Sequence, residues 1–532
     1  MNFPTRTSVY IDQLARTIAE VEPNVKDYLE VAVILEILGV TDETARAHGY
    51  DGVFALAREV EPLVEMYRPP PGAGPTALEK RRSAPVLFLL GMFYNLWWVI
   101  MLVALFLGGQ SLWASVNLPP AIATSIGLGV ILGLVTTGGM QQFASWKMTY
   151  YLLQDNKPLA RFVVDKALFW GLVLLFGVGA AYVLVNEYLF PMGFGITAVT
   201  VLYLLLIGLF RLMVVPVYAL KRYLPLFLSA IVALVFMFSS LAAFQAAGLP
   251  RVSAVVGSQV TGLFALIAVS GTFLYLYVYR EELQTPGPDE PPFYSRPEKP
   301  KHVRPPQFVM LFHDGLPYVA YGSLFFLYLF ADRLVAWRNL ATPGLAYNAA
   351  YQIGVDMALL LLIPLTGIKF VFIYRLSDSM RTTLRGIRVT HPAIFGRWLA
   401  AFYGRMMVAL WVAGLLFVVV AWLLSDRIIA FAGGNRTSLD VFRLAIFGVF
   451  FFSVFLANAV FSLAFRRTWG LSILLAIGTI ANFVLASTFA TSGNSAQGVL
   501  GFVVTAMYLG IASSGYVYSF ASRADYAHYT AM

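Results

Sequence analysis

The stretch REELQTPGPDEPPFYSRPEKPKHVRPPQ, residues 280–307, divides the chain into two halves of similar character. It carries eight prolines among charged and polar residues. Because proline fixes φ and lacks a backbone N–H, this stretch is predicted to be an extended, solvated tether rather than a helix. Six long apolar runs precede it and six follow it. This six-plus-six arrangement decides the fold.

Each apolar run is about 19 to 29 residues long, and about 20 helical residues cross the roughly 30 Å of hydrocarbon in a bilayer. Inside lipid every backbone N–H and C=O needs an internal partner, so the runs are predicted to be helices. The longest run implies a tilted or broken helix. The predicted spans are 85–107, 119–143, 167–186, 191–210, 224–247, 253–279, 307–331, 346–374, 406–424, 438–463, 469–490 and 498–520.

The predicted fold class is therefore an all-α polytopic membrane protein. Its twelve transmembrane helices form two six-helix bundles, preceded by a small cytoplasmic helical N-terminal domain. Transporters built from repeated bundles have this layout, with a binding site at the bundle interface. The predicted segments are a head at 1–68, a Pro/Gly linker at 69–83, bundles at 84–280 and 307–522, a tether at 281–306 and a tail at 523–532.

The positions of the basic residues predict the orientation in the membrane. From residue 81 onward, 24 Lys and Arg fall on predicted inner segments and 6 on outer segments if the chain begins inside. This positive-inside bias predicts that both termini are cytoplasmic. The formal charge of +9 combines −6 over residues 1–80 with +15 over the rest. The basic excess therefore indicates topology and attraction to anionic membrane lipid, not nucleic-acid binding.

The residues point away from catalysis and from bound cofactors. There is no cysteine, and the five histidines have no metal-ligand spacing, so neither a disulfide nor a metal site is predicted. No phosphate loop is present, and ATP hydrolysis is not predicted. A membrane glycosyltransferase would need acid or base groups on an ordered aqueous loop, whereas the predicted outer loop 108–119 carries no charge. We therefore expect no catalytic residue, no enzyme activity and no cofactor.

The head, residues 8–68, is predicted to contain three or four short soluble helices. Asp51 is a predicted N-cap for a helix that buries Val53, Leu56 and Val60. About 60 residues give only a small core, so the head is expected to lean on the membrane domain or on a partner. Two roles stay open: a docking or stabilising appendage, and a module that recruits or regulates a partner.

Ionisable side chains at membrane depth are costly, so each is a candidate functional residue. Asp356 is the strongest candidate for a charge facing a cavity, because it lies inside the eighth span, roughly 20 Å from Lys369. Asp332 and Arg333 end the seventh span close to Trp337. These three residues are candidates for substrate contact; the alternative is an interfacial anchor in which Asp332 and Arg333 pair with each other.

Further charges lie near the ends of the predicted spans. Arg443 is predicted to meet Asp356 or Asp440 and to suit an anionic substrate, or alternatively to extend outward to the interface. His313 and Asp314 lie near the inner end of the seventh span and are candidates for a gate or for ion coupling. Their alternative is an interfacial pair at the cytoplasmic surface.

Two remaining features concern coupling and helix packing. Lys369, at the inner end of the eighth span, is a third candidate for a gate or for ion coupling. The glycine pair concerns helix packing instead of coupling. In the second span, Gly129 and Gly133 form a small-xxx-small pair that is predicted to pack against another helix.

Three stretches carry a family resemblance. Thr137–Gln142, followed by Lys147 and Tyr150–Leu152, is similar to a Thr-Gly-Pro…Arg-Tyr-Leu pattern. Tyr328–Trp337 is similar to a Trp-x-Asp-Lys…Trp segment, and Tyr347–Gly367 resembles a Tyr-Asp…Ile-Pro-Gly span. These patterns belong to the membrane subunit of the Pel-type polysaccharide export machinery. That family is part of the MOP class of multidrug, oligosaccharidyl-lipid and polysaccharide exporters.

The resemblance has two departures. Arg333 and Lys147 replace the lysine and arginine of the family pattern, and the acidic head matches no pattern of the family. The rival class of twelve-span transporters, the major facilitators, has a Gly-x-x-x-Asp-Arg signature that the loop from Trp146 to Lys166 lacks.

The resemblance implies a MOP or MATE-like fold, with two V-shaped bundles around a central cavity through which a glycan passes. It also implies a partner glycosyltransferase that feeds the glycan from the cytoplasm. Asp332, Arg333 and Trp337 carry over as matched positions.

We therefore expect a transporter of the bacterial inner membrane that exports or flips polysaccharide or lipid-linked glycan by alternating access. One alternative is a cation-coupled small-molecule exporter of the same fold, with Asp356 as the carboxylate that binds a proton or sodium ion. A second alternative is a non-transporting scaffold that assembles a glycan synthase through its head.

Overall fold

The structure is a computed structural model of the chain. It describes residues 6–21, 25, 27–38, 40–67, 83–93, 96–115, 118–153, 156–189, 193–220, 224–280, 307–338, 345–386, 392–490 and 495–523. The predicted tether at 281–306 lies outside the described residues, as do all but Ser83 of the predicted linker and all but Arg523 of the predicted tail.

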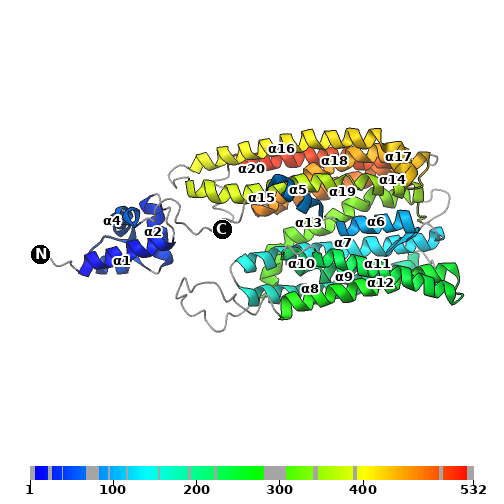
Figure 1. Ribbon diagram of the computed structural model, residues 1–532, viewed down its shortest axis with the longest axis horizontal. Helices are drawn as coiled ribbons and strands as arrows, with labels where there is room; N and C mark the ends of the chain where they lie inside the picture. The colour runs from blue at the N-terminus through cyan, green and yellow to red at the C-terminus, as the bar shows by residue number, and fades with distance from the viewer. Residues whose placement is uncertain are drawn as a thin grey trace. The chain divides into compact units, whose positions relative to one another are not determined.

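The head contains four helices, as predicted: α1 (Arg6–Val21), α2 (Tyr28–Ile37), α3 (Asp42–Ala47) and α4 (Val53–Met66) (Figure 1). Helix α4 packs against both α1 and α2. Ile18, Leu35 and Leu56 are among the apolar side chains that are fully buried between them. The head therefore has a hydrophobic core of its own.

The start of α4 differs from the prediction. Its N-cap is Gly52 rather than Asp51, and Gly52 has no side chain to accept a hydrogen bond. The carboxylate of Asp42, from α3, takes over this role and accepts a hydrogen bond from the Val53 N–H at 2.9 Å. A residue eleven positions away in sequence thus caps the helix, which a local pattern could not indicate.

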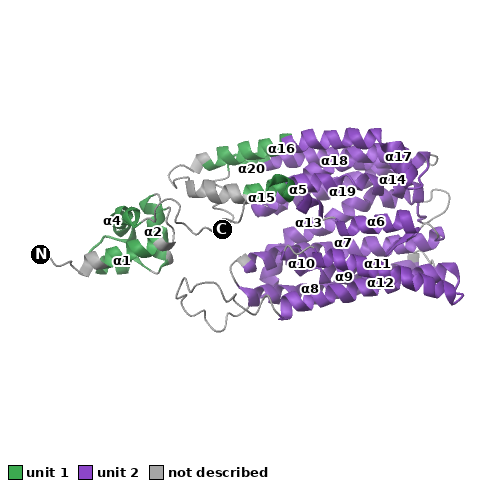
Figure 2. Ribbon diagram, in the orientation of Figure 1, with its two compact units in different colours: residues 1–88, 370–408, 518–532 green, residues 89–369, 409–517 purple. Residues whose placement is uncertain are grey.

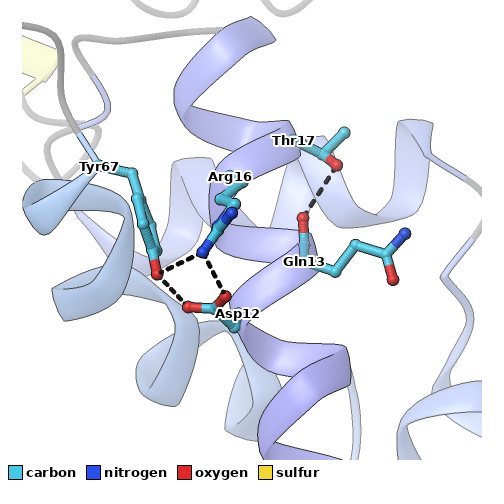
Figure 3. Close-up of polar contacts among 5 residues, drawn as sticks. All are labelled: Asp12, Gln13, Arg16, Thr17 and Tyr67. Atoms are coloured by element: carbon cyan, nitrogen blue, oxygen red, sulfur yellow. Dashed lines mark hydrogen bonds and ion pairs between the residues drawn. The ribbon is translucent and has the colours of Figure 1, made fainter.

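A polar cluster ties α1 to the end of α4 (Figure 3). The Tyr67 hydroxyl donates to Asp12, whose other carboxylate oxygen lies 3.1 Å from the Arg16 guanidinium. Arg16 also donates to the Tyr67 hydroxyl at 3.4 Å. The hydrogen bond to Tyr67 and the neighbouring Asp12 raise the pKa of the Arg16 guanidinium. The three residues hold the two helix ends together at the surface.

The first half of the membrane region is helical apart from one short hairpin. Its elements are α5 (Ala84–Phe93), α6 (Leu96–Gly108), β1 (Gln110–Ser111), β2 (Ala114–Ser115), α7 (Pro120–Leu153), α8 (Lys157–Leu189), α9 (Phe194–Met213), α10 (Val215–Ala219), α11 (Leu224–Ala246), α12 (Arg251–Leu274) and the π-helix η1 (Tyr275–Arg280). Pro120 opens α7, where its missing N–H leaves no donor unpaired.

The second half is mostly helical in its described residues, apart from short connections and an isolated β-bridge between Arg338 and Leu345. Its elements are α13 (Phe308–Ala336), α14 (Ala349–Leu359), α15 (Leu362–Gly386), α16 (Pro392–Leu423), α17 (Ser425–Phe431), α18 (Arg436–Ala464), α19 (Thr468–Phe489), the 3₁₀ helix η2 (Ser495–Gly498) and α20 (Val499–Ala521). The outer and inner ends of these helices are named after the predicted orientation, so Ala336 marks the outer end of α13.

The lengths and hydropathy of the helices confirm the fold class. Eleven helices are long and apolar enough to cross a membrane among the described residues, and the number is twelve if α5 and α6, which are bent by 56° relative to each other, count as one broken span. Large apolar side chains such as Phe176, Val412 and Ile480 remain more than half exposed, as expected for lipid-facing surfaces. The chain is a multi-pass membrane protein.

Two spans are interrupted. The eighth span breaks between α14 and α15 at residues 360–361, which confirms the break implied by its length. Pro364 lies in the first turn after this break, where a proline is tolerated. The first span, predicted as one run at 85–107, is divided into α5 and α6; residues 94–95 between them lie outside the described part.

Both halves repeat the same helix pairing. In the first half α7 packs against α9, and α6 packs against α11, which pairs the second span with the fourth and the first with the fifth. In the second half α14 packs against α18, and α13 packs against α19, which pairs the eighth with the tenth and the seventh with the eleventh. An internal repeat of this kind is typical of secondary transporters.

The chain divides into two compact units (Figure 2). One comprises residues 1–88, 370–408 and 518–532, and the other comprises residues 89–369 and 409–517. The larger unit contains the helices that pack across the two halves and the contacts between them.

The hairpin β1–β2 is buried in the first half. Leu112, in its turn, is fully buried, and Gln259 of α12 donates to the carbonyl groups of Ser111 and Ala114 at 2.9 and 3.0 Å. Gln259 also accepts a hydrogen bond from the Tyr203 hydroxyl at 2.6 Å. Gln259 is thus a polar residue inside an apolar bundle whose amide nitrogen and oxygen are both hydrogen-bonded, and it holds the loop after the first span.

Helix α7 joins the two halves through a close contact with α13. A Cβ added to Gly138 would lie 2.6 Å from the carbonyl oxygen of Gly322, and one added to Gly127 would lie 2.5 Å from the indole ring of Trp337. The two helices are therefore antiparallel, with backbones in contact where neither residue has a side chain. We call Gly138, Gly139 and Gly322 the glycine seam.

A second set of glycines on α7 faces α9. A Cβ on Gly133 would lie 3.0 Å from the carbonyl oxygen of Leu204, and Gly129 lies against Thr200. These contacts confirm the predicted helix packing of the small-xxx-small pair. Helix α7 therefore contacts its own half with one glycine face and the opposite half with another.

Substituting Gly322 tests the seam. We expect Gly322→Ala to lower the Tm of the purified protein by several degrees, because the new methyl group must push the two backbones apart, and overpacking costs about 1 to 3 kcal/mol. Gly177→Ala is the matched control, since no atom lies within 4 Å of a Cβ at that position of α8. Equal Tm values for the two variants would contradict the close contact.

Candidate functional site

The outer end of α13 carries two consecutive charged residues that are both buried. Asp332 and Arg333 are each 1% exposed. The Arg333 guanidinium donates to Asp356 of α14 at 3.3 Å, and this carboxylate also accepts a hydrogen bond from the Gln352 amide at 2.8 Å. The Arg333 guanidinium also lies 4.9 Å from the centre of the Phe330 ring. Arg333 thus links two spans inside the membrane domain.

Asp332 has a different partner from the one predicted. Its carboxylate accepts a hydrogen bond from the Tyr351 hydroxyl at 2.6 Å. The expected mutual ion pair of Asp332 and Arg333 is therefore wrong, because consecutive helical residues point about 100° apart and each meets a different residue of α14. Both side chains are buried, and the predicted interfacial depth of the pair stays a prediction.

The local structure of α14 places these partners. The Asn348 side chain caps α14 by accepting a hydrogen bond from the Tyr351 N–H at 3.1 Å. Gln352 and Asp356 are one turn apart on the helix, so the Gln352 amide reaches the Asp356 carboxylate that Arg333 also contacts. The cap fixes where the helix begins and therefore which residues face α13.

Trp337 extends this group toward the first half. Its indole ring packs against Gly127 of α7, and its centre lies 5.1 Å from the Tyr347 ring. The Tyr347 N–H donates to the hydroxyl of Thr124, also on α7, at 2.8 Å. Residues of α7, α13 and the start of α14 therefore meet at one place. We call this group the outer junction: Thr124, Gly127, Asp332, Arg333, Trp337, Tyr347, Tyr351, Gln352 and Asp356.

The outer junction has buried polar atoms without partners among the described residues. These atoms are Asp332 Oδ1, Arg333 Nε, Trp337 Nε1 and Gln352 Oε1. An unpaired buried polar group costs about 1 to 3 kcal/mol, so four in one group are unusual. The junction also holds two carboxylates against one guanidinium.

Arg443 lies outside this group. It donates to the Ser425 hydroxyl and to the Asp426 carboxylate, both at 2.9 Å. The predicted contact with Asp356 or Asp440 is therefore wrong. The short helix α17 places Asp426 within reach of Arg443, and the Asp426 side chain is 70% exposed. Arg443 thus forms a surface ion pair, which fits the alternative that it extends outward.

A second charged group joins the halves at the inner end. Lys147 of α7 pairs with Asp314 of α13, and Arg466 lies 3.5 Å from the other oxygen of Asp314. The Lys147 ammonium also lies 4.4 Å from the Trp146 ring, which stacks on Tyr318 at 3.9 Å. We call Trp146, Lys147, Asp314, Tyr318 and Arg466 the inner clasp.

The other two gate or coupling candidates lie elsewhere. His313 is exposed on α13. Lys369 is 7% exposed on α15, and no described residue forms an ion pair or hydrogen bond with its ammonium group. Their roles as gate or coupling residues stay predictions. Among the described residues, no group of three or more His, Cys, Asp or Glu side chains is arranged to hold a metal ion.

Several residues of the outer junction were not identified from the sequence as site residues. Gln352 lies one turn before Asp356, and this spacing is a signal that would have found it; Tyr351 had no such signal, because its partner Asp332 lies on another helix. Thr124 and Gly127 had no such signal, because their part in the junction depends on how α7 packs against α13.

Solved structures of similar fold are transporters. A MATE protein in its bent conformation matches with a TM-score of 0.57 and 12% identity, over 83% of this chain and 96% of that one. An inward-facing multidrug resistance MATE family transporter of the MOP superfamily matches with a TM-score of 0.55 and 14% identity, over 83% of this chain and 99% of that one.

A MOP superfamily transporter from Pyrococcus furiosus matches with a TM-score of 0.52 and 14% identity, over 82% of this chain and 96% of that one. No family model matches the sequence, and no curated protein matches it. At these identities the likeness shows the fold, which is that of MATE and MOP transporters. The narrower resemblance to the Pel-type subunit stays a prediction.

Removing Arg333 tests whether the outer junction depends on its one cation. We expect Arg333→Met to destabilise the purified protein strongly, by about 3 to 5 kcal/mol, because it leaves buried carboxylates without a counter-charge. Arg333→Met combined with Asp356→Leu should cost less than the sum of the single substitutions. Tm measured in detergent checks both expectations.

The control for this experiment is Arg443→Met, which breaks the exposed pair with Asp426 and should cost about 1 kcal/mol or less. Equal losses for Arg333→Met and Arg443→Met would contradict the assignment of Arg333 as the buried link between α13 and α14.

Proposed function

We propose that this chain exports or flips a polysaccharide or lipid-linked glycan across the bacterial inner membrane by alternating access. The MATE and MOP fold supports a membrane transporter as such. The choice of a glycan as substrate rests on the residues that carry the Pel-type resemblance and on where they lie in the fold.

The observation that carries this proposal is the convergence of the resembling stretches. Tyr328–Trp337 and Tyr347–Gly367 supply every member of the outer junction that lies in the second half. Thr137–Gln142 contains two of the three glycines of the seam. Chance similarities would be scattered over the helices. These stretches instead meet along one contact between the halves, which is where a site is expected in a transporter of this layout.

The contacts between α7 and α13 offer a mechanism. The glycine seam lies in the middle, the outer junction lies at one end and the inner clasp at the other. Alternating access requires that one end opens while the other stays closed. Both ends are held by polar contacts that water can replace, whereas the seam is held by backbone packing. We therefore infer that the seam is the pivot and that the two polar groups open in turn.

Deletion and complementation test the glycan proposal. In a strain lacking this chain, secreted and surface polysaccharide should fall to background and return with the full-length protein. A version with residues 76–532 should also restore it, because transport resides in the membrane domain. Immunoblots of membrane fractions control for expression. Unchanged polysaccharide in the deletion strain would contradict the proposal.

The same strains address the head. If only the full-length protein restores secretion while both versions reach the membrane, the head is a required docking or regulatory module. That result would favour the scaffold alternative, in which the head gathers a glycosyltransferase that supplies the glycan. Membrane lipid is the only further partner that the charge distribution implies.

A cation-coupled small-molecule exporter is the second candidate function, and one observation favours it. The outer junction holds two carboxylates and one guanidinium, and Asp332 Oδ1 has no partner among the described residues. A carboxylate in that situation is suited to take up a proton or a sodium ion. Asp356, the carboxylate expected to do so, is instead engaged by Arg333 and Gln352.

Ion-driven dye efflux separates the two functions. Everted vesicles that contain the protein should show no gradient-driven ethidium transport above vesicles from the deletion strain. The rates of ethidium transport should then be equal for Asp332→Asn and for the surface control Asp426→Asn. Ethidium transport that Asp332→Asn abolishes and Asp426→Asn retains, with glycan secretion intact, would support the small-molecule exporter instead.

A further inference from the structure

We propose that the outer junction is a binding subsite for sugar hydroxyl groups, at which the transported glycan contacts the chain on the outer part of its path. This inference rests on the proposed function and deepens it by naming the contact residues and their chemistry. It concerns a neutral part of the substrate, the sugar ring with its hydroxyls, rather than a phosphate or a metal ion.

The four unpartnered atoms define the kind of ligand. Arg333 Nε and Trp337 Nε1 are hydrogen-bond donors, while Asp332 Oδ1 and Gln352 Oε1 are acceptors. A ligand that satisfies all four must both donate and accept. Hydroxyl groups do both, and adjacent hydroxyls on a sugar ring offer several such groups within a short distance. An anion offers only acceptors, and a cation needs only oxygen ligands.

The charged groups of the outer junction leave both a donor and an acceptor open. Arg333 and Asp356 neutralise each other at 3.3 Å, and the Tyr351 hydroxyl occupies one oxygen of Asp332. The remaining Nε–H of Arg333 and Oδ1 of Asp332 are opposite in charge. Hydrogen bonds to ionised groups are stronger than bonds between neutral groups, so a hydroxyl that binds either group gains from its charge.

Two aromatic rings adjoin these atoms. The rings of Trp337 and Tyr347 lie 5.1 Å apart and are tilted by 54°. A ligand site typically combines such apolar, aromatic walls with a few placed polar groups. Trp337 contributes to both, since its ring offers an apolar face and its Nε1 is one of the four unpartnered atoms.

The outer junction is closed in this structure. Trp337 is 3% exposed, and the hydrogen bond from Tyr347 to Thr124 holds the start of α14 against α7. A sugar therefore binds only after α7 separates from the second half at this end. Trp337, which packs against Gly127 of α7, then becomes accessible, so glycan binding favours the outward-open state.

A photo-reactive residue tests the contact directly. p-Benzoylphenylalanine is placed at Tyr347 in a strain that secretes polysaccharide through the substituted protein alone. Illumination should yield an adduct that an antibody against the polysaccharide detects and that a glycoside hydrolase removes. The same residue at Trp422, exposed on α16, is the control and should give no adduct. Secretion without an adduct at position 347 would overturn the inference.

Two conservative substitutions distinguish ligand contact from a structural role. Trp337→Phe removes the indole N–H but keeps an aromatic ring, and Asp332→Asn keeps the shape of the side chain. Each should reduce the adduct at position 347 several-fold without lowering the amount of protein in the membrane. An undiminished adduct in both variants would mean that these atoms bind only water or a cation, and the inference would fail.

Different results would contradict the proposed glycan transport and the proposed sugar subsite. If deletion of the chain leaves polysaccharide unchanged, the proposed function is wrong and the subsite falls with it. If deletion abolishes polysaccharide but position 347 yields no adduct, the transport proposal stands and only the subsite is wrong.

Discussion

The close approach of α7 and α13 is the contact on which the rest of the membrane domain depends. The seam brings the backbone of Gly138 against that of Gly322, which requires that both positions lack a Cβ. Without a hydrophobic driving force between helices in lipid, van der Waals packing at small residues is a main source of association. This contact joins two halves that repeat the same helix pairing.

Helix α7 contacts both halves at glycine residues. Glycines on one face of the helix meet α9 and glycines on another meet α13. On either side of the seam, polar residues of α7 meet the second half: Lys147 pairs with Asp314, and the Thr124 hydroxyl accepts a hydrogen bond from the Tyr347 N–H. A close backbone contact with polar contacts at both ends is therefore the arrangement of this helix pair.

Much of the fold could be predicted from the sequence, because hydropathy and the twelve run lengths follow directly from the thickness of a bilayer. The break in the eighth span followed from its excess length. The contacts of individual charges were less predictable. Asp356 was found as a residue of interest, but the pairing considered for Arg333 was with Asp332, its neighbour in sequence, and not with Asp356. For Arg443 an interior contact and an outward position were both considered, and the contact with Asp426, which α17 supplies at the surface, fits the outward position. Helix packing decides these pairs, and no local pattern records it.

The most direct test of the account is to lock the outer junction and to follow secretion. The chain has no cysteine, so Thr124→Cys with Tyr347→Cys creates one pair of thiols across the halves. The hydrogen bond between these residues implies Cα atoms within about 7 Å, close enough for a disulfide. We predict that oxidation stops polysaccharide secretion and that a reducing agent restores it. Complete disulfide formation with undiminished secretion would contradict the claim that the halves separate at the outer junction to let a glycan pass.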